Sequence, residues 1–336
     1  MVRLTTTAVS SLALGASGLA LGTPGEQRHE VGGKWVGWKN IKKAFIFGDS
    51  YTQTGFDYTQ TQPSAQNPFG NPTYPGWTSS NGPNWVGYLT FKYNASAILT
   101  YNLAYGGATV DSSLVTPYNP SVKSLRDQVE SEFIPGYTGN SSKVKWTGDD
   151  SIFAIWIGIN DIGNSYWNGA DQTDVLNAKI FNVISGLVDK VYSAGGRNYV
   201  LINVPPLDRT PLIIPQGESA VSLSKADVAA WNKKVVELAQ AVKAKANTNV
   251  WVYDANKSFG EVMDDPTSHA ETSGLKNTTD FCAAYQNGTP AQDTLNASCG
   301  VPVNRYFWLN NLHPTSAIHE VVAKGVADLL AAGPNV

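Results

Sequence analysis

Five short runs of apolar, β-branched or aromatic residues, with helix-like segments between several of them, most constrain what this 336-residue chain can fold into. Each run has the length and composition of a strand that is buried on both faces. We predict strands at Lys43 to Phe47, Ala97 to Leu103, Ser151 to Ile157, Tyr199 to Val204 and Asn249 to Tyr253.

Three other segments carry apolar residues at helical spacing. The clearest is Asp174 to Ala194, which ends at the pair Gly195-Gly196, and the others are about Lys225 to Ala246 and Ser316 to Ala332. Strands that alternate with helices predict an α/β protein, with a parallel sheet covered on both faces. In such folds ligands bind at the carboxyl ends of the strands.

The beginning of the chain differs from the rest. Residues 1–22 have Arg3 near the start, a small and apolar run, and small residues at the end, which predicts a secretory signal peptide. Residues 23–42 mix Gly, charge and Trp without a period and are interpreted as an N-terminal tail or arm. Residues 43–336 are predicted to form a single domain.

Two further features agree with a secreted, extracellular protein. The only two cysteines, Cys282 and Cys299, are expected to pair in an oxidising compartment. Two free thiols are the alternative, and a metal site is disfavoured because two cysteines alone make a poor ligand set. The chain also carries six N-glycosylation acceptors, at Asn94, Asn140, Asn256, Asn277, Asn287 and Asn296.

Charge and composition restrict the partners. A net charge of −3 with 15% charged residues argues against nucleic acid, which requires a basic patch. No stretch after the signal reaches the ~20 apolar residues of a membrane span, and we expect no metal, cofactor or obligate protein partner. Two long loops, Tyr58 to Asn84 and Asp264 to Asn304, are rich in polar residues and are expected to shape a binding cleft.

The sequence Gly48-Asp49-Ser50-Tyr51 directly follows the first predicted strand. A strand that ends at Gly48 leaves Ser50 at the carboxyl edge of the sheet, where its hydroxyl can attack a carbonyl if a histidine takes its proton. The alternative interpretation is a strand that ends in an Asx-type turn.

Candidate donors for the oxyanion of such a reaction follow the next two strands. The backbone N–H of Gly107 is accessible to a ligand because no side chain blocks its approach, and Asn160 offers a short amide on a tight turn. Gly107 alone is also compatible with a simple turn, and Asn160 with an Asx cap on the next helix.

The partner histidine is chosen from only four. His29 lies in the tail, His269 in a polar loop and His319 on the last helix. Only His313 combines a loop position just before a helix with a following proline, Pro314, that restricts its backbone. Ser50 and His313 are therefore the candidate nucleophile and base.

These residues, in this order, resemble the four blocks of the GDSL, or SGNH, hydrolase superfamily: Gly48-Asp49-Ser50-Tyr51, Gly107, Gly158-x-Asn160-Asp161 and His313-Pro314-Thr315. The resemblance spans about Lys43 to the C-terminus. More narrowly, Ser50 to Phe56, Asn67 to Pro72 and Tyr74 to Thr78 resemble secreted fungal acetylesterases of carbohydrate esterase family sixteen.

The resemblance implies a three-layer α/β/α fold related to flavodoxin. It also implies that Ser50 is the nucleophile and His313 the base, and that the Ser50 N–H, the Gly107 N–H and the Asn160 side chain form the oxyanion hole. The implied substrates are acetyl esters on plant-derived sugars such as xylo-oligosaccharides, without a metal.

One position departs from the superfamily pattern. The Asp that usually stands three residues before the histidine is Asn310 here. An Asn carbonyl can hold the histidine tautomer but brings no negative charge, and the amide can also flip. The backbone carbonyl of Trp308 or a carboxylate from another loop are alternative partners for His313, and an impaired site is a further alternative. We expect an active site that works as a Ser50–His313 dyad.

Two other functions are weighed against a secreted acetylesterase. A lipase or phospholipase of the same superfamily needs an apolar acyl groove, which loops of Asn, Gly, Pro and Ser do not favour. A carbohydrate-binding protein that has lost turnover would account for Asn310 and the aromatic loops.

Overall fold

Five parallel strands form the sheet of the computed structural model, which describes residues 34–336. The strand order is β2-β1-β3-β4-β5, and each neighbouring pair runs parallel. The strands are β1 Lys43–Gly48, β2 Leu99–Asn102, β3 Ser151–Trp156, β4 Asn198–Ile202 and β5 Asn249–Tyr253. The predicted α/β class and five-stranded parallel sheet are confirmed, and this order is that of flavodoxin-like folds.

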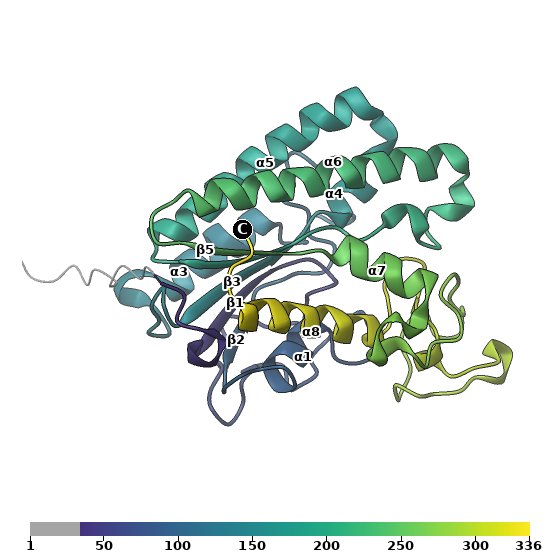
Figure 1. Cartoon of the computed structure of the whole chain (residues 1–336), viewed down its shortest axis with the longest axis horizontal. Coiled ribbons are helices and arrows are strands. Elements are labelled where there is room, and N and C mark those ends of the chain that lie inside the picture. The colour runs from purple at the N-terminus through teal and green to yellow at the C-terminus, as the bar shows by residue number, and fades with distance from the viewer. Residues whose placement is uncertain (1–33) are drawn as a thin grey trace, which may run out of the picture.

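Helices cover both faces of the sheet (Figure 1). Helices α5 and α6 lie over one face, and α1 and α8 pack together over the other. Within the described residues the helices are α1 Trp85–Phe91, α2 Leu125–Asp127, α3 Ile134–Tyr137, α4 Ile159–Gly163, α5 Ala170–Ser193, α6 Glu218–Lys243, α7 Ala255–Asp264 and α8 Ser316–Ala332, with a π-helical segment η2 Gln128–Phe133 between α2 and α3. Two helical layers are needed because the strands are buried on both faces.

The long helices agree with the sequence prediction in place but not in where they begin. Helix α8 has the predicted bounds, whereas α5 and α6 begin earlier than expected, directly after Gly169 and Gly217. These two glycines have φ angles of 86° and 93°, which other residues seldom adopt, so each marks the helix start. The sequence does not predict helix α1, because five of its seven residues are buried and only Tyr88 and Phe91 are accessible, so no narrow apolar stripe appears.

The described part of the N-terminal segment packs on the sheet domain. Trp38 and Ile41 are buried, and the indole N–H of Trp38 donates to the carbonyl of Tyr93 at 3.2 Å. The signal peptide predicted at residues 1–22 and His29 lie outside the described residues, and the division of the chain at residue 43 stays a prediction. No helix within residues 34–336 has the length and apolar character that crossing a membrane requires.

Cys282 and Cys299 form the predicted disulfide. It joins a small second core beneath the loop of residues 264–304, made of Tyr285, Val303, Tyr306 and Leu309. Leu309 directly precedes the segment that carries Asn310 and His313, so the disulfide supports the approach to the candidate site.

Removing this disulfide is expected to destabilise the protein by about 3 kcal/mol, because the bond closes a loop with a sequence separation of 17 residues. The double variant Cys282→Ala/Cys299→Ala should show a lower urea midpoint than the oxidised wild type. The reduced wild type is the matched control and should unfold at the midpoint of the double variant. An unchanged midpoint in both would contradict a stabilising role for the disulfide.

Candidate active site

Ser50 lies in the turn that ends β1, at the carboxyl edge of the sheet. The carboxylate of Asp49 accepts the backbone N–H of Tyr51 at 3.0 Å, and its carbonyl accepts those of Thr52 and Gln53 at 3.1 and 2.9 Å. This is the Asx-type turn that stood as the alternative interpretation. The two interpretations coincide, because the Asx turn is what presents Ser50.

Gly48 allows β1 to end in close contact with β3. A Cβ at this position would lie 2.3 Å from the carbonyl oxygen of Trp156, a distance that no side chain tolerates. The side-chain amide of Gln128 bonds both backbone groups of Gly48. Its Oε1 accepts the Gly48 N–H at 2.9 Å, and its Nε2 donates to the Gly48 carbonyl at 2.8 Å. The backbone that precedes Ser50 is therefore fixed from two sides.

Two asparagines and a tryptophan fix the backbone that follows Ser50. Asn84 Nδ2 donates to the carbonyls of Thr52 and Gln53 at 2.9 and 2.8 Å, and Asn102 Nδ2 donates to the Thr52 carbonyl at 2.7 Å. The indole of Trp85 donates to the Thr52 hydroxyl at 3.1 Å. Sequence analysis missed these residues, although Asn84 stands where an N-cap of α1 is expected.

His313 meets Ser50 from the loop before α8. Its Nε2 lies 2.7 Å from Ser50 Oγ, within hydrogen-bond distance. Tyr51 also joins the two segments, because its hydroxyl donates to the carbonyl of Leu312 at 2.5 Å and its ring packs edge-on against the imidazole. The structure thus brings the predicted pair together over a separation of 263 residues.

Asn310 holds the other side of the imidazole. Its Oδ1 lies 3.0 Å from His313 Nδ1 and also accepts the backbone N–H groups of Leu312 and His313, at 3.0 and 2.8 Å. A flipped amide would place its own N–H groups against these backbone donors, so the Oδ1 orientation is fixed. Nδ1 therefore carries the proton, and Nε2 presents a lone pair to the Ser50 hydroxyl.

Within residues 34–336, neither alternative partner proposed for His313, the Trp308 carbonyl or a carboxylate from another loop, contacts its Nδ1. The residue facing Nδ1 is Asn310. Burial alone lowers the pKa of His313 to about 4. The imidazole is consequently neutral near pH 7, the form that accepts a proton.

Two buried carboxyls lie near the reacting edge without facing the imidazole. Burial raises the pKa of Asp49 to about 7 and that of Asp161 to about 8, and in Asp161 the nearby Asp49 adds to the effect. Asp161 also accepts the backbone N–H of Val110 at 3.0 Å. Asp161 therefore links the start of α4 to the strand-end segment that contains Gly107.

The candidate oxyanion donors lie at the same edge. Asn160 does not cap α4, because the cap position is Gly158 and no side chain bonds there. Instead its Nδ2 donates to the carbonyl of Ala108 at 3.0 Å, and within the described residues its second N–H has no bonded partner. Gly107 has a φ of 79°, in the region that favours glycine. The roles of the Ser50 and Gly107 N–H groups and of Asn160 stay predictions.

The two long loops contact each other through Asn81 and Thr289, and their role in shaping a binding cleft stays a prediction. Asn81 Nδ2 donates to the Thr289 hydroxyl at 2.8 Å, and Asn81 Oδ1 accepts the Thr289 N–H at 2.7 Å. A cavity of about 340 Å³ lies between the loops and the start of α8, where Thr315 and Ser316 line it. Both residues follow His313 closely in the chain, but neither Ser50 nor His313 lines the cavity.

The chain is similar to known ester hydrolases along almost its whole length. Residues 45–326 match the family model described as GDSL-like Lipase/Acylhydrolase. An acetylesterase from Thermothelomyces thermophilus is 36% identical over 97% of this chain and 96% of the relative. An acetylesterase from Hypocrea jecorina is 25% identical over 85% of this chain and 87% of the relative. An acetylxylan esterase structure from Geobacillus stearothermophilus aligns with a TM-score of 0.48 and 14% identity, covering 89% of this chain and 95% of that one.

The substitution Asn310→Asp is expected to raise the pKa of His313 from about 4 by one unit or more, because a carboxylate next to Nδ1 favours the charged imidazolium. The pKa is measured from the imidazole resonances in an NMR titration. Asn311→Asp is the matched control, since it adds the same charge at an exposed neighbouring position where water screens it. Equal shifts in both variants would contradict the direct Asn310–His313 contact.

Proposed function

The chain belongs to the GDSL-like lipase/acylhydrolase family and is a carboxylic ester hydrolase, and from this premise we propose that it removes acetyl groups from carbohydrates through an acyl-enzyme on Ser50. The observation that carries the proposal is the 2.7 Å contact between Ser50 Oγ and His313 Nε2. A serine hydroxyl hydrogen-bonded to an imidazole lone pair is the arrangement of an activated nucleophile.

In the first half of the proposed reaction, Ser50 Oγ attacks the ester carbonyl carbon and its proton passes to His313 Nε2. The carbonyl oxygen becomes an oxyanion, which accepts hydrogen bonds from the Ser50 and Gly107 N–H groups and from the free N–H of Asn160. The bond to the alcohol then breaks, and the alcohol leaves with the proton from Nε2. Acetate remains esterified to Ser50.

In the second half, water attacks the acetyl carbon of the acyl-enzyme and gives a proton to His313 Nε2. The tetrahedral intermediate collapses, Ser50 Oγ takes the proton back from Nε2, and acetic acid leaves and loses its proton to water. Asn310 orients the imidazole in both halves through its Oδ1. Because Asn310 carries no charge, the site acts as a Ser50–His313 dyad with a positioning amide.

The substrate class rests on relatives and on surface chemistry. The two acetylesterases that resemble the chain support a short acyl group. The two long loops are polar where they meet, at residues such as Asn81 and Gln292, which suits hydroxyl-rich substrates better than long acyl chains. Acetylated xylo-oligosaccharides are the sugar esters that we propose.

Hydrolysis of p-nitrophenyl esters from acetate to octanoate tests the reaction and the acyl class together. We expect acetate to be the best substrate and the rate to fall with chain length, with activity absent in Ser50→Ala. A preference for octanoate would favour the lipase alternative. An absence of turnover in a folded wild type would favour the carbohydrate-binding alternative.

The roles of His313 and Asn310 are separated by two further variants. His313→Ala should lose about 10⁶-fold in kcat, because the general base is removed. Asn310→Ala should retain measurable activity, since it removes only the positioning of a base that stays in place. Equal losses in the two variants would rule out the dyad.

We further propose that the protein is secreted. The signal-like residues 1–22, the disulfide between Cys282 and Cys299 and the glycosylation acceptors support export. The acceptors at Asn140, Asn287 and Asn296 are exposed, whereas Asn256 is half-buried and its amide donates to the carbonyl of Val204 at 3.1 Å.

Protein secreted by a fungal host should therefore carry glycans at Asn140, Asn287 and Asn296 and none at Asn256. Mass spectrometry after treatment with peptide N-glycosidase identifies the sites, because each released glycan leaves an Asp. A glycan at Asn256, or none at the three exposed positions, would contradict this assignment.

A further inference from the structure

Tyr118 is an exposed aromatic residue held directly against Gly107. It is 80% exposed, yet a Cβ at Gly107 would lie only 2.2 Å from Cε1 and 2.7 Å from Cδ1 of its ring. The ring therefore occupies the space that a side chain at position 107 would need. Both the positive φ angle at position 107 and the closeness of the Tyr118 ring therefore favour glycine there over a residue with a side chain.

Two adjacent glycines relate the ring of Tyr118 to the nucleophile. A Cβ at Gly106 would be 3.9 Å from Cβ of Ser50, so Gly106 lies beside Ser50 while the next residue, Gly107, lies beside the Tyr118 ring. One part of the ring faces Gly107, and most of its remaining surface is open to solvent. A substrate whose carbonyl reaches Ser50 and Gly107 has the rest of its ester within reach of that surface.

The loop that carries Tyr118, residues 111–124, is closed at its base. The Leu125 N–H donates to the carbonyl of Thr109 at 2.9 Å, and the Arg126 N–H donates to that of Val110 at 3.1 Å. Compact loops with joined ends keep a defined shape and are frequently functional. The position of Tyr118 is therefore set by the loop and not by contacts of the ring alone.

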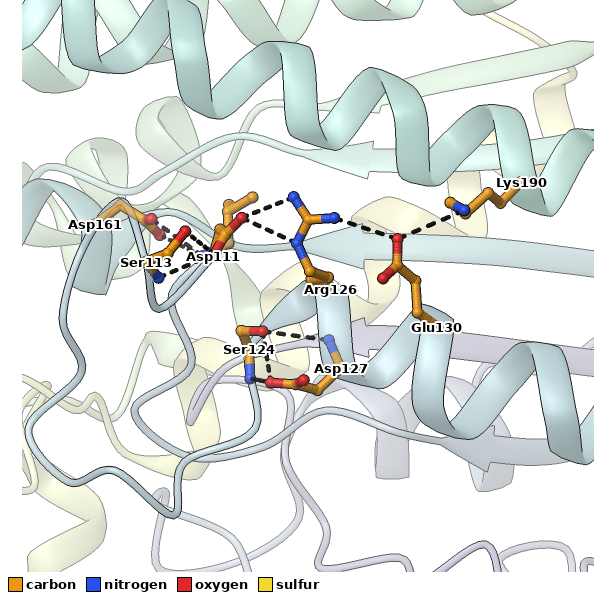
Figure 2. Close-up of polar contacts among 9 residues, drawn as sticks. Asp111, Ser113, Ser124, Arg126, Asp127, Glu130, Asp161 and Lys190 are labelled. Carbon is orange, nitrogen blue, oxygen red and sulfur yellow. Dashed lines mark hydrogen bonds and ion pairs between the residues drawn. The ribbon is translucent and has the colours of Figure 1, made fainter.

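Figure 2 shows how side chains anchor the same base. Arg126 donates to Asp111 Oδ2 through Nε and Nη2 at 2.9 and 2.7 Å, and Glu130 pairs with both Arg126 and Lys190. At the other end Ser124 and Asp127 cap α2 reciprocally. Charges joined in a network hold a geometry better than an isolated surface pair.

Apolar residues of the loop point inward while Tyr118 does not. Val115 and Val122 are 4% and 5% exposed and belong to the main core, and the hydroxyl of Thr109 donates to the Val115 carbonyl at 2.9 Å. A tyrosine between two buried valines is left outside on a loop that is otherwise well anchored. Its ring is thus available to a ligand.

We propose that Tyr118 is a specificity-determining residue, whose ring stacks on the sugar of the alcohol half of the substrate. This inference rests on the proposed acetylesterase function. The exposed ring suits the sugar better than the acyl group, because a small acetyl group needs an enclosed pocket and a pyranose presents a broad face. An aromatic face packs against the C–H groups of such a ring, while the sugar hydroxyls stay in water.

The substitution Tyr118→Ala should reduce the preference for sugar esters. We expect the ratio of kcat/KM for acetylated xylobiose to kcat/KM for ethyl acetate to fall about five- to tenfold, the size of one aromatic contact. Tyr118→Phe should keep the wild-type ratio, because it keeps the ring. Tyr192→Ala is a matched control that removes a ring at the opposite end of the sheet, where the Tyr192 hydroxyl donates to the Ala246 carbonyl before β5.

Calorimetric binding of acetylated xylobiose to Ser50→Ala separates this inference from the proposed function, because binding needs no turnover. Adding Tyr118→Ala to that variant should raise Kd about five- to tenfold, and adding Tyr118→Phe should not. An unchanged Kd, or equal weakening by Ala and Phe, would overturn stacking on the ring. Hydrolysis that persists in Ser50→Ala would instead overturn the proposed function, whereas the measured effect of Tyr118 on Kd would still hold.

Discussion

The close approach of β1 and β3 at Gly48 is the constraint on which the candidate site depends. With no Cβ in the way, the end of β1 lies against the Trp156 carbonyl, and Gln128 pairs with both backbone groups of Gly48. The Asx turn then begins from a fixed point and sets the direction of Ser50. A movement of this strand end would change the 2.7 Å contact with His313, since that contact spans two otherwise separate segments.

The second property of the site is that, within residues 34–336, the imidazole is bonded to an amide and a hydroxyl and to no charged group. Asn310 Oδ1 accepts hydrogen bonds from three donors, one of them His313 Nδ1, and so fixes the tautomer of His313 as a carboxylate would. Unlike a carboxylate, the amide contributes a dipole and no charge. Burial is then unopposed and lowers the pKa of His313 to about 4. The base stays available in acidic solution, while the imidazolium that forms during the reaction receives less stabilisation than an Asp would give.

The sequence predicts the parts of this arrangement that have a local signal. Buried runs mark the strands, and Ser50, Gly107 and Asn160 stand in the segments that follow three of them, while the position of Asn310 follows from its spacing to His313. The amides of Asn102 and Gln128 have no such signal for their role at this edge, because they bond backbone groups 50 and 80 residues away. Asn84 has a local signal only as the cap of α1, and its bonds to Thr52 and Gln53 span 32 and 31 residues. The contact of Tyr118 with Gly107 cannot be predicted from the sequence either, since only the folded loop brings the two residues together.

Gly107 shows how chemistry and recognition can share one position. Its N–H belongs to the rigid sheet edge with Ser50, whereas the space left by its missing side chain is filled by a ring from a separate loop. The edge is held by hydrogen bonds to the backbone, and the loop by the network around Arg126. The edge and the loop share one residue, because Gln128, which pairs with Gly48, also donates to the Lys123 carbonyl at 3.4 Å. Tyr118 takes no part in that contact, so a change at position 118 can alter what the alcohol half of the ester touches and leave the bonds of the Ser50–His313 pair in place.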